Sequence, residues 1–221
     1  MRTAYHSQLS TLSAELSTLC DETARAMQAA TESLLGADLD RAERVISDRG
    51  RIASLNGAAW QAAFDLLALQ QPVAADLRAV VSAIHIASDV DRMNTLAVHI
   101  AEVARRRHPK CAVPEEVKHY FADMGGVAVQ MAGTASDVLA SRDPATAVRL
   151  SEDDDAMDDL HRQLLSALFD RNWPHGVAAT VDIVLLGRFY ERFADHAVQI
   201  GRRVVFEATG ALPAGQTVAT Y

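Results

Sequence analysis

The chain has 221 residues, of which 49% are hydrophobic, 23% are charged and only 5% are aromatic. These fractions exclude an intrinsically disordered chain, and the scarcity of aromatic residues favours a core of close-packed helices over a β-sheet. The net charge of −8 argues against a nucleic-acid-binding protein, and the one basic run, residues 105–107, falls at an expected helix end.

Six long helical segments are predicted, because proline and glycine interrupt an otherwise continuous helical pattern. Asp38 and Asp143 are suitable N-caps, Pro72 and Pro144 suit first helical turns, and Gly210 suits a helix end. The expected helices span residues 7–35, 38–71, 72–107, 114–141, 143–170 and 173–210. Long helices with short connections pack as antiparallel neighbours in a bundle.

An internal duplication divides the chain. The segment Asp-Arg-Met-Asn-Thr-Leu-Ala-Val-His-Ile at 91–100 is matched in one frame by Glu-Arg-Phe-Ala-Asp-His-Ala-Val-Gln-Ile at 191–200. Residues 108–114 contain two prolines and read as a linker. We therefore expect an all-α fold of two tandem antiparallel three-helix bundles, over residues 1–108 and 114–210, followed by a flexible tail over 211–221.

The sixth predicted helix carries two stripes of side chains. The apolar stripe, which should face the core, comprises Phe189, Phe193, Ala197, Ile200 and Val204. The opposite stripe comprises Val184, Arg188, Glu191, Asp195, Val198 and Arg202. Glu191 and Asp195 are four residues apart, so their carboxylates share one side of the helix and repel each other. Either a salt-bridge network with Arg188 and Arg192 or a bound divalent cation would offset this repulsion.

The fifth predicted helix contains an acidic run in which Asp154 and Asp158 repeat this spacing. Acidic residues near a helix start are stabilised by the helix dipole, so a solvated face is the favoured interpretation and a metal site is the alternative. In the first half Asp91 corresponds to Glu191, but Thr95 stands where Asp195 stands in the second half. A hydroxyl is a poorer ligand than a carboxylate, so a metal site in the first half should be weaker or absent.

The sequence contains no P-loop, dinucleotide-binding fingerprint, nucleophile elbow or zinc-protease motif, so we expect an adaptor and not an enzyme. The alternative from another class is a di-metal carboxylate bundle for metal storage or oxidation, since Glu116-x-x-His119 and Asp158-x-x-His161 resemble half of its ligand pattern, although only the first has the required Glu. The first residues lack an apolar signal sequence, and no run approaches the roughly 20 apolar residues that span a bilayer, which predicts a cytoplasmic protein.

Two segments resemble the signatures of one family. Residues 191–197 read Glu-Arg-Phe-Ala-Asp-His-Ala, which looks like the Glu-Arg-Ile-Gly/Ala-Asp-His-Ala signature of PhoU. Residues 71–78 read Gln-Pro-Val-Ala-Ala-Asp-Leu-Arg, which is similar to the family's Gln-Pro-x-Ala-x-Asp-Leu-Arg segment. The resemblance covers both halves and is closest to mycobacterial-type members. It implies two PhoU domains and an accessory role between a phosphate ABC transporter and a sensor histidine kinase, repressing phosphate-starvation signalling and phosphate uptake when phosphate is abundant.

The resemblance also implies functional residues. Some family members bind iron or zinc through Glu/Asp-x-x-x-Asp motifs, which Glu191 with Asp195 and Asp154 with Asp158 satisfy, whereas Asp91 with Thr95 does not. Charged residues in and beside the repeated and signature segments are candidates for contact with the kinase and the transporter ATPase: Asp76, Arg78, Arg92, Arg188 and Arg192. These partners would bring the protein to the membrane without inserting it, and a homodimer is a further expectation.

Overall fold

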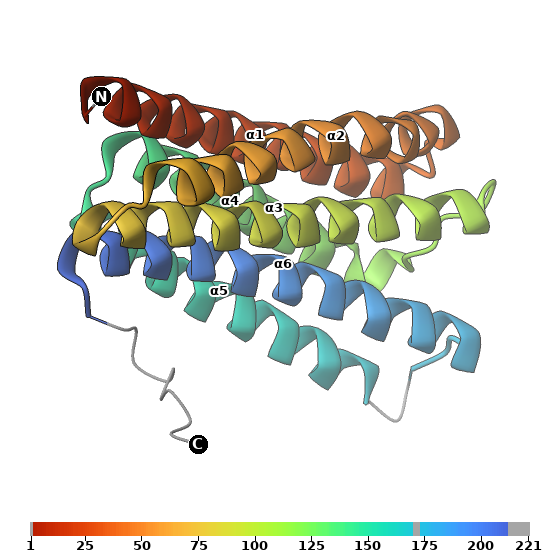
Figure 1. Cartoon of the computed structure of the whole chain (residues 1–221). Coiled ribbons are helices and arrows are strands. Elements are labelled where there is room, and N and C mark those ends of the chain that lie inside the picture. The colour runs from red at the N-terminus through yellow and green to blue at the C-terminus, as the bar shows by residue number, and fades with distance from the viewer. Residues whose placement is uncertain (1, 170–172, 212–221) are drawn as a thin grey trace, which may run out of the picture.

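The computed structural model describes residues 2–169 and 173–211, and this part of the chain is an all-α bundle (Figure 1). The helices are α1 (Arg2–Gly36), α2 (Leu39–Gln70), α3 (Ala74–Arg107), the short 3-10 helix η1 (Glu115–Val117), α4 (Lys118–Ser141), α5 (Pro144–Leu168) and α6 (Val177–Thr209). The six long predicted helices are therefore confirmed. The predicted tail, apart from Ala211, lies outside the described residues.

Local side-chain chemistry explains several helix ends. The Asp38 carboxylate caps α2 by accepting a hydrogen bond from a backbone N–H three residues on, at 2.9 Å. Asp143 caps α5 by accepting from the N–H groups of Ala145 and Thr146, at 3.0 and 3.3 Å. Gly210 follows α6 with φ of 73°, the left-handed conformation in which glycine commonly ends a helix.

Three predicted helix starts, those of the third, fourth and sixth helices, were too early, and the first helix begins earlier than predicted, at Arg2 instead of Ser7. The third helix begins at Ala74 instead of Pro72, because Gln71 has a left-handed backbone with φ of 48° and the chain must turn before it can resume a helix. The sixth begins at Val177 instead of Trp173. The fourth is preceded by η1, so its first turn is a separate 3-10 helix.

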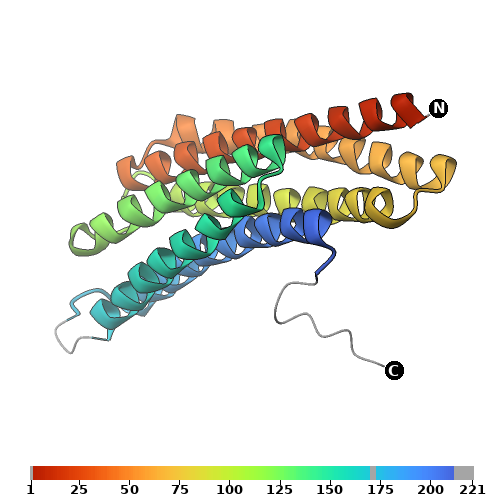
Figure 2. The same ribbon diagram turned by 90° about the vertical axis from the view of Figure 1, so that its left-hand side faces the viewer.

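The two halves pack along the same long axis. Within each half, α2 lies against α1 and α3, and α5 lies against α4 and α6; between the halves, α1 packs on α4 and α3 on α6 (Figures 1 and 2). The α3–α6 pair is antiparallel along its length, since Ser82 bonds the carbonyl of Arg203 at one end and Arg106 bonds Asp182 at the other. The repeated segments therefore lie side by side, and an approximate two-fold axis relates the halves.

One glycine sets the distance between α1 and α4. A Cβ added at Gly125 would lie 2.6 Å from Cγ2 and 2.8 Å from Oγ1 of Thr31, so only glycine fits there. The Thr31 hydroxyl donates to the Met27 carbonyl at 2.9 Å and lies 2.8 Å from the hydroxyl of Tyr190. Because Tyr190 belongs to α6, this contact joins three helices from both halves.

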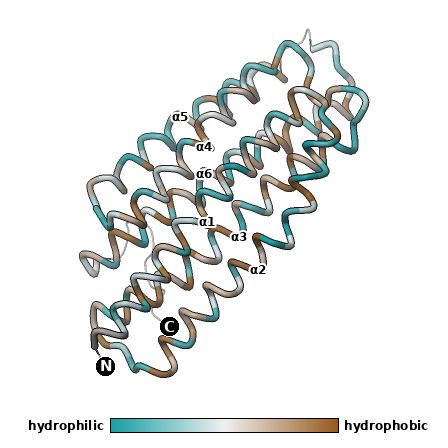
Figure 3. Tube along the Cα trace, turned by 90° about the horizontal axis from the view of Figure 1, so that it is seen from above, coloured by the Kyte–Doolittle hydropathy of each residue, from teal (hydrophilic) through white to brown (hydrophobic). Residues whose placement is uncertain are grey.

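The buried apolar residues form one cluster that extends through both halves. Its largest fully buried members are aromatic, namely Tyr190, Phe121 and Phe193, but most of it consists of Ala, Leu, Val, Met and Ile, as the composition predicted. Hydrophobic and hydrophilic residues alternate along every helix (Figure 3), the pattern of helices with one side buried. None of the described helices combines the length and the apolar character that crossing a bilayer requires.

Candidate functional site

The predicted pair of carboxylates lies on α6 beside two arginines. Arg188 donates a hydrogen bond to Glu191, and Arg192 donates to Asp195 at 3.4 Å. The Glu191 side chain is only 15% exposed, whereas that of Asp195 is 42% exposed. The salt-bridge network that the sequence predicted as one of two interpretations is therefore present, with the better-buried acid paired to Arg188.

Carboxylates from α5 face those from α6. Burial, together with the neighbouring charges of Asp158 and Asp195, raises the pKa of Asp154 to about 6. Burial and the charge of Asp195 also raise the pKa of Glu191, although Arg188 opposes this effect. We name these four residues, Asp154, Asp158, Glu191 and Asp195, the acidic face. Gly201 of α6 permits the close approach of the two helices, since a Cβ at this position would lie 2.8 Å from Cδ1 of Leu150 on α5.

The acidic face has donors of the type that a hard cation prefers, since all four residues are carboxylates. As placed, however, no three His, Cys, Asp or Glu side chains in residues 2–169 and 173–211 converge closely enough to hold a metal ion. Asp91 lies on α3, in the other half of the molecule, and is half-buried. The Glu116 carboxylate lies 3.3 Å from Nε2 of His175, so its nearest imidazole is not that of His119.

The candidate partner-binding residues differ in their surroundings. The side chains of Arg188 and Arg192 are about half exposed, at 51% and 46%, and Arg92 is exposed as well. Arg78 is instead turned toward the end of α6, where its Nε donates to the Glu207 carbonyl at 3.4 Å. The Asp76 carbonyl accepts from the Tyr5 hydroxyl at 3.2 Å, which fixes the start of α3 on α1.

The division of α6 into a core stripe and a polar stripe was partly wrong. Val198, placed on the polar stripe, is buried, and Phe189, placed on the core stripe, is only half-buried against the ring of His99. Tyr190 lies on neither stripe yet is completely buried. The physical reason is that α6 packs against α3, α4 and α5, so three of its sides are covered and a two-sided wheel does not describe it.

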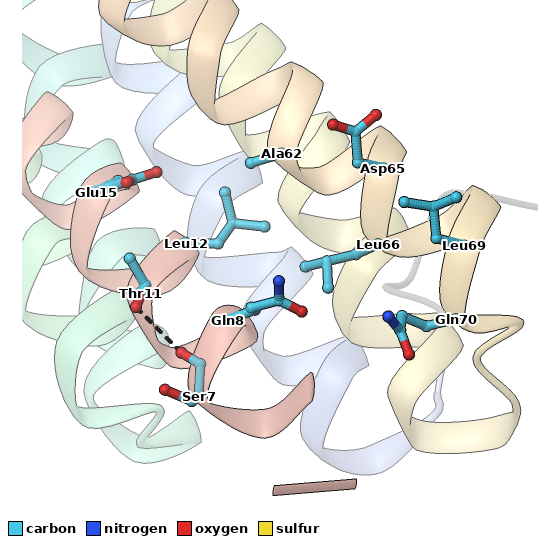
Figure 4. Close-up of a pocket in the computed structure, with 10 residues that line it drawn as sticks. All are labelled: Ser7, Gln8, Thr11, Leu12, Glu15, Ala62, Asp65, Leu66, Leu69 and Gln70. Atoms are coloured by element: carbon cyan, nitrogen blue, oxygen red, sulfur yellow. Dashed lines mark hydrogen bonds between the residues drawn. The ribbon is translucent and has the colours of Figure 1, made fainter. Parts of the chain in front are cut away.

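Exposed apolar side chains cluster around the turn that carries the 71–78 signature. Leu69 and Val73 are 76% and 73% exposed, and Leu77 is also exposed. A groove of about 310 Å³ between α1 and α2 adjoins this turn, and Figure 4 shows Leu12, Leu66 and Leu69 in it together with the acid Glu15. The second half exposes apolar residues at the corresponding place: Phe169, Val177, Val181 and Leu185.

The family model for the PhoU domain matches the chain twice, over residues 16–104 and 121–204. Phosphate-specific transport system accessory protein PhoU homolog 2 of Mycobacterium tuberculosis is 60% identical over 213 residues, which cover 96% of this chain and 100% of that protein. PhoU homolog 1 of Mycobacterium leprae is 58% identical over 218 residues, covering 99% of this chain and 98% of that protein.

Among solved structures, the phosphate transport system regulatory protein PhoU from Streptococcus pneumoniae superposes with a TM-score of 0.83 at 23% identity, covering 95% of this chain and 99% of that one. This likeness confirms the fold. The two matches to the family model correspond to the two repeated halves, and the sequence relatives extend over nearly the whole chain. The chain therefore belongs to the PhoU family.

Proposed function

We propose that this protein is a phosphate-transport accessory protein that keeps phosphate-starvation signalling off when phosphate is plentiful. In this proposal it links a phosphate ABC transporter to a sensor histidine kinase in the cytoplasm and has no reaction of its own. The observation that carries the proposal is the 60% identity, over the full length of the relative, to a protein named as an accessory of the phosphate-specific transport system.

The exposed side chains support a role in binding other proteins. The apolar residues Leu69, Val73 and Leu77 surround the signature turn, and exposed apolar side chains of this kind often mark protein contacts. The half-exposed guanidinium groups of Arg188 and Arg192 lie beside the acidic face, where a partner could exchange one ion pair for another. A helical surface with both features suits the docking of a kinase helix pair or a transporter ATPase.

A promoter reporter for phosphate starvation tests the proposal. The gene is deleted, together with any second homologue that would mask the loss, and cells are grown in high phosphate. The reporter should turn on and should be silenced again when the gene is restored. A reporter that stays silent in the deleted strain would contradict the repressor role.

Variants of the acidic face test whether its carboxylates are needed for repression. Asp195→Ala should weaken repression while the circular dichroism spectrum remains helical, because this side chain is 42% exposed and paired only with Arg192 among the described residues. Asp159→Ala is the matched control, since Asp159 is also an exposed acid in an i,i+3 pair with an arginine but lies outside the acidic face. Equal repression by both variants would remove the acidic face from the mechanism.

Iron or zinc binding at the acidic face remains a prediction, supported by the raised pKa of Asp154 between neighbouring carboxylates. Metal analysis of the purified protein, with Asp154→Asn as the comparison, tests it directly. The di-metal oxidase alternative predicts oxygen consumption by the metal-loaded protein, which an adaptor would not show. A homodimer is likewise a prediction, and sedimentation analysis decides it.

A further inference from the structure

A cleft opens where the two halves are connected. It has a volume of about 540 Å³ and lies between the end of α3, the connection 108–114, the start of α4 and the first turns of α6. We name it the linker cleft. The lining residues that are charged at neutral pH are Arg106, Arg107, Lys110 and Lys118, together with the two acids Glu115 and Asp182. Leaving aside His175, whose ring lies 3.3 Å from the Glu116 carboxylate, the lining thus carries four cations and two acids, an excess of two positive charges, in a chain whose net charge is −8.

A buried acid holds the two arginines in place. Asp182 is 5% exposed, and its two oxygens accept from Arg106 Nη2 at 3.0 Å and from Arg107 Nε at 2.5 Å. Arg107 also donates to the Ala178 carbonyl at 3.3 Å. One carboxylate balances only one of the two guanidinium groups, so an unbalanced positive charge remains on donors that are already oriented.

The two lysines add charge from the other walls. Lys110 and Lys118 are the only lysines of the chain, and both line the linker cleft. Lys118 pairs with Glu115 at 2.7 Å, but Glu115 is 83% exposed, so water competes strongly for this ion pair. Lys110 has no ion-pair partner among the described residues, which leaves its ammonium group available to a ligand.

The internal duplication shows that the fold does not require this charge. In the frame that aligns Asp91 with Glu191, the positions equivalent to Arg106 and Arg107 are Phe206 and Glu207. At that end Glu207 pairs with Arg142 at 3.5 Å, and burial raises the pKa of the Glu207 carboxyl. The position of Arg107 is therefore acidic in the second half and that of Arg106 is apolar, so the two halves do not share the basic residues of the linker cleft.

We propose that the linker cleft binds an oxyanion of the phosphate class. Guanidinium and ammonium donors reach it from several walls, which suits a tetrahedral anion with oxygens on all sides better than a planar carboxylate. The excess of two positive charges also matches a dianion better than a monoanion. Because its walls come from both halves and from their connection, a bound anion would bridge the two halves at this end of the molecule.

Nuclear magnetic resonance of the full-length protein with isotope-labelled lysine tests the proposal without background, because both labelled residues lie in the cleft. Inorganic phosphate, pyrophosphate and ATP are titrated separately at constant ionic strength, with sodium chloride as the replaced salt. At least one of them should shift both lysine signals along a saturable curve, and the tightest binder identifies whether free phosphate, a phosphate chain or a nucleotide is the source of the phosphoryl group.

Lys110→Gln should weaken this binding about fivefold or more, with Lys118 as the remaining reporter. Arg49→Gln, which removes one exposed positive charge from α2 away from the cleft, should leave it unchanged. The proposal is overturned if none of the three anions gives a saturable shift, if acetate binds as tightly as phosphate, or if Lys110→Gln binds like the parent protein. The result is independent of the proposed function, because the binding experiment involves neither the kinase nor the transporter.

Discussion

Replacement of Gly125 by alanine should destabilise the protein, whereas the same change at the adjacent Gly126 should stabilise it. Alanine in a helix interior is favoured over glycine by about 1 kcal/mol. Gly126 is exposed and nothing lies within 4 Å of its added Cβ, so most of this gain should appear there. At Gly125 the new methyl group would lie 2.6 Å from Thr31 Cγ2, and overpacking of this kind costs about 1–3 kcal/mol.

Thr31 cannot rotate away without losing its hydrogen bonds to Met27 and Tyr190. We therefore expect Gly125→Ala to lower the free energy of unfolding by about 1 kcal/mol net and Gly126→Ala to raise it by about 0.5–1 kcal/mol. In a protein of this size, each 1 kcal/mol corresponds to about 2–4 °C in Tm. Thermal and urea unfolding followed by circular dichroism measure both variants.

The double variant Thr31→Ala with Gly125→Ala tests the proposed cause. Removal of the Thr31 methyl and hydroxyl groups removes the two shortest contacts and leaves only Thr31 Cβ, 3.1 Å from the added Cβ, so the alanine at 125 should cost less in this background than in the parent protein. Equal stability of Gly125→Ala and Gly126→Ala, or the same cost in both backgrounds, would refute the argument that this glycine sets the spacing between α1 and α4.

Three further outcomes can be measured on the purified protein. Since the pKa of Asp154 is raised from 3.8 to about 6, the charged carboxylate opposes folding at neutral pH. Asp154→Asn should therefore raise the free energy of unfolding by about 1 kcal/mol at pH 7.5, allowing for solvent screening. This advantage should shrink as the pH falls through about 6, which urea unfolding at several pH values would show. Asp182→Ala should lower the free energy of unfolding, measured in urea, by about 2 kcal/mol because it leaves Arg106 and Arg107 without their carboxylate partner. A decrease below about 0.5 kcal/mol would contradict the anchoring role of this acid. A thiol reagent should label at most Cys111 in the native protein and both cysteines in urea, since Cys20 is fully buried and its thiol pKa is raised by burial; rapid native labelling of two thiols would argue against this packing.

The sequence was sufficient to predict the features that depend on local chemistry. Asp143 followed by Pro144 is a cap and a first-turn proline, and Gly210 is a helix terminator, because their effects act on the backbone beside them. The match between residues 91–100 and 191–200 likewise predicted two similar halves. In the structure these two segments lie side by side in the α3–α6 pair.

Features that depend on contacts between distant helices could not be predicted in the same way. Tyr190 is buried because Thr31 reaches it from α1, and no periodicity within α6 encodes that contact. The sequence indicates only that Arg106 and Arg107 are cations at a helix end, since their partner Asp182 lies 76 and 75 residues further along the chain. The acidic face was predicted as two separate pairs, and only the packing of α5 on α6 shows that these pairs interact.

The antiparallel pairing of α3 with α6 and of α1 with α4 has a consequence for how such a chain could have arisen. A chain ending near Arg107 would leave the buried sides of α1 and α3 without a cover, and a second identical copy could supply it through the same two-fold axis. The present protein is in this sense a dimer joined into one chain. Joining removes the requirement that both subunits be identical, so Arg107 and its counterpart Glu207, at opposite ends of the molecule, could acquire opposite charges while the interface between the two halves was kept.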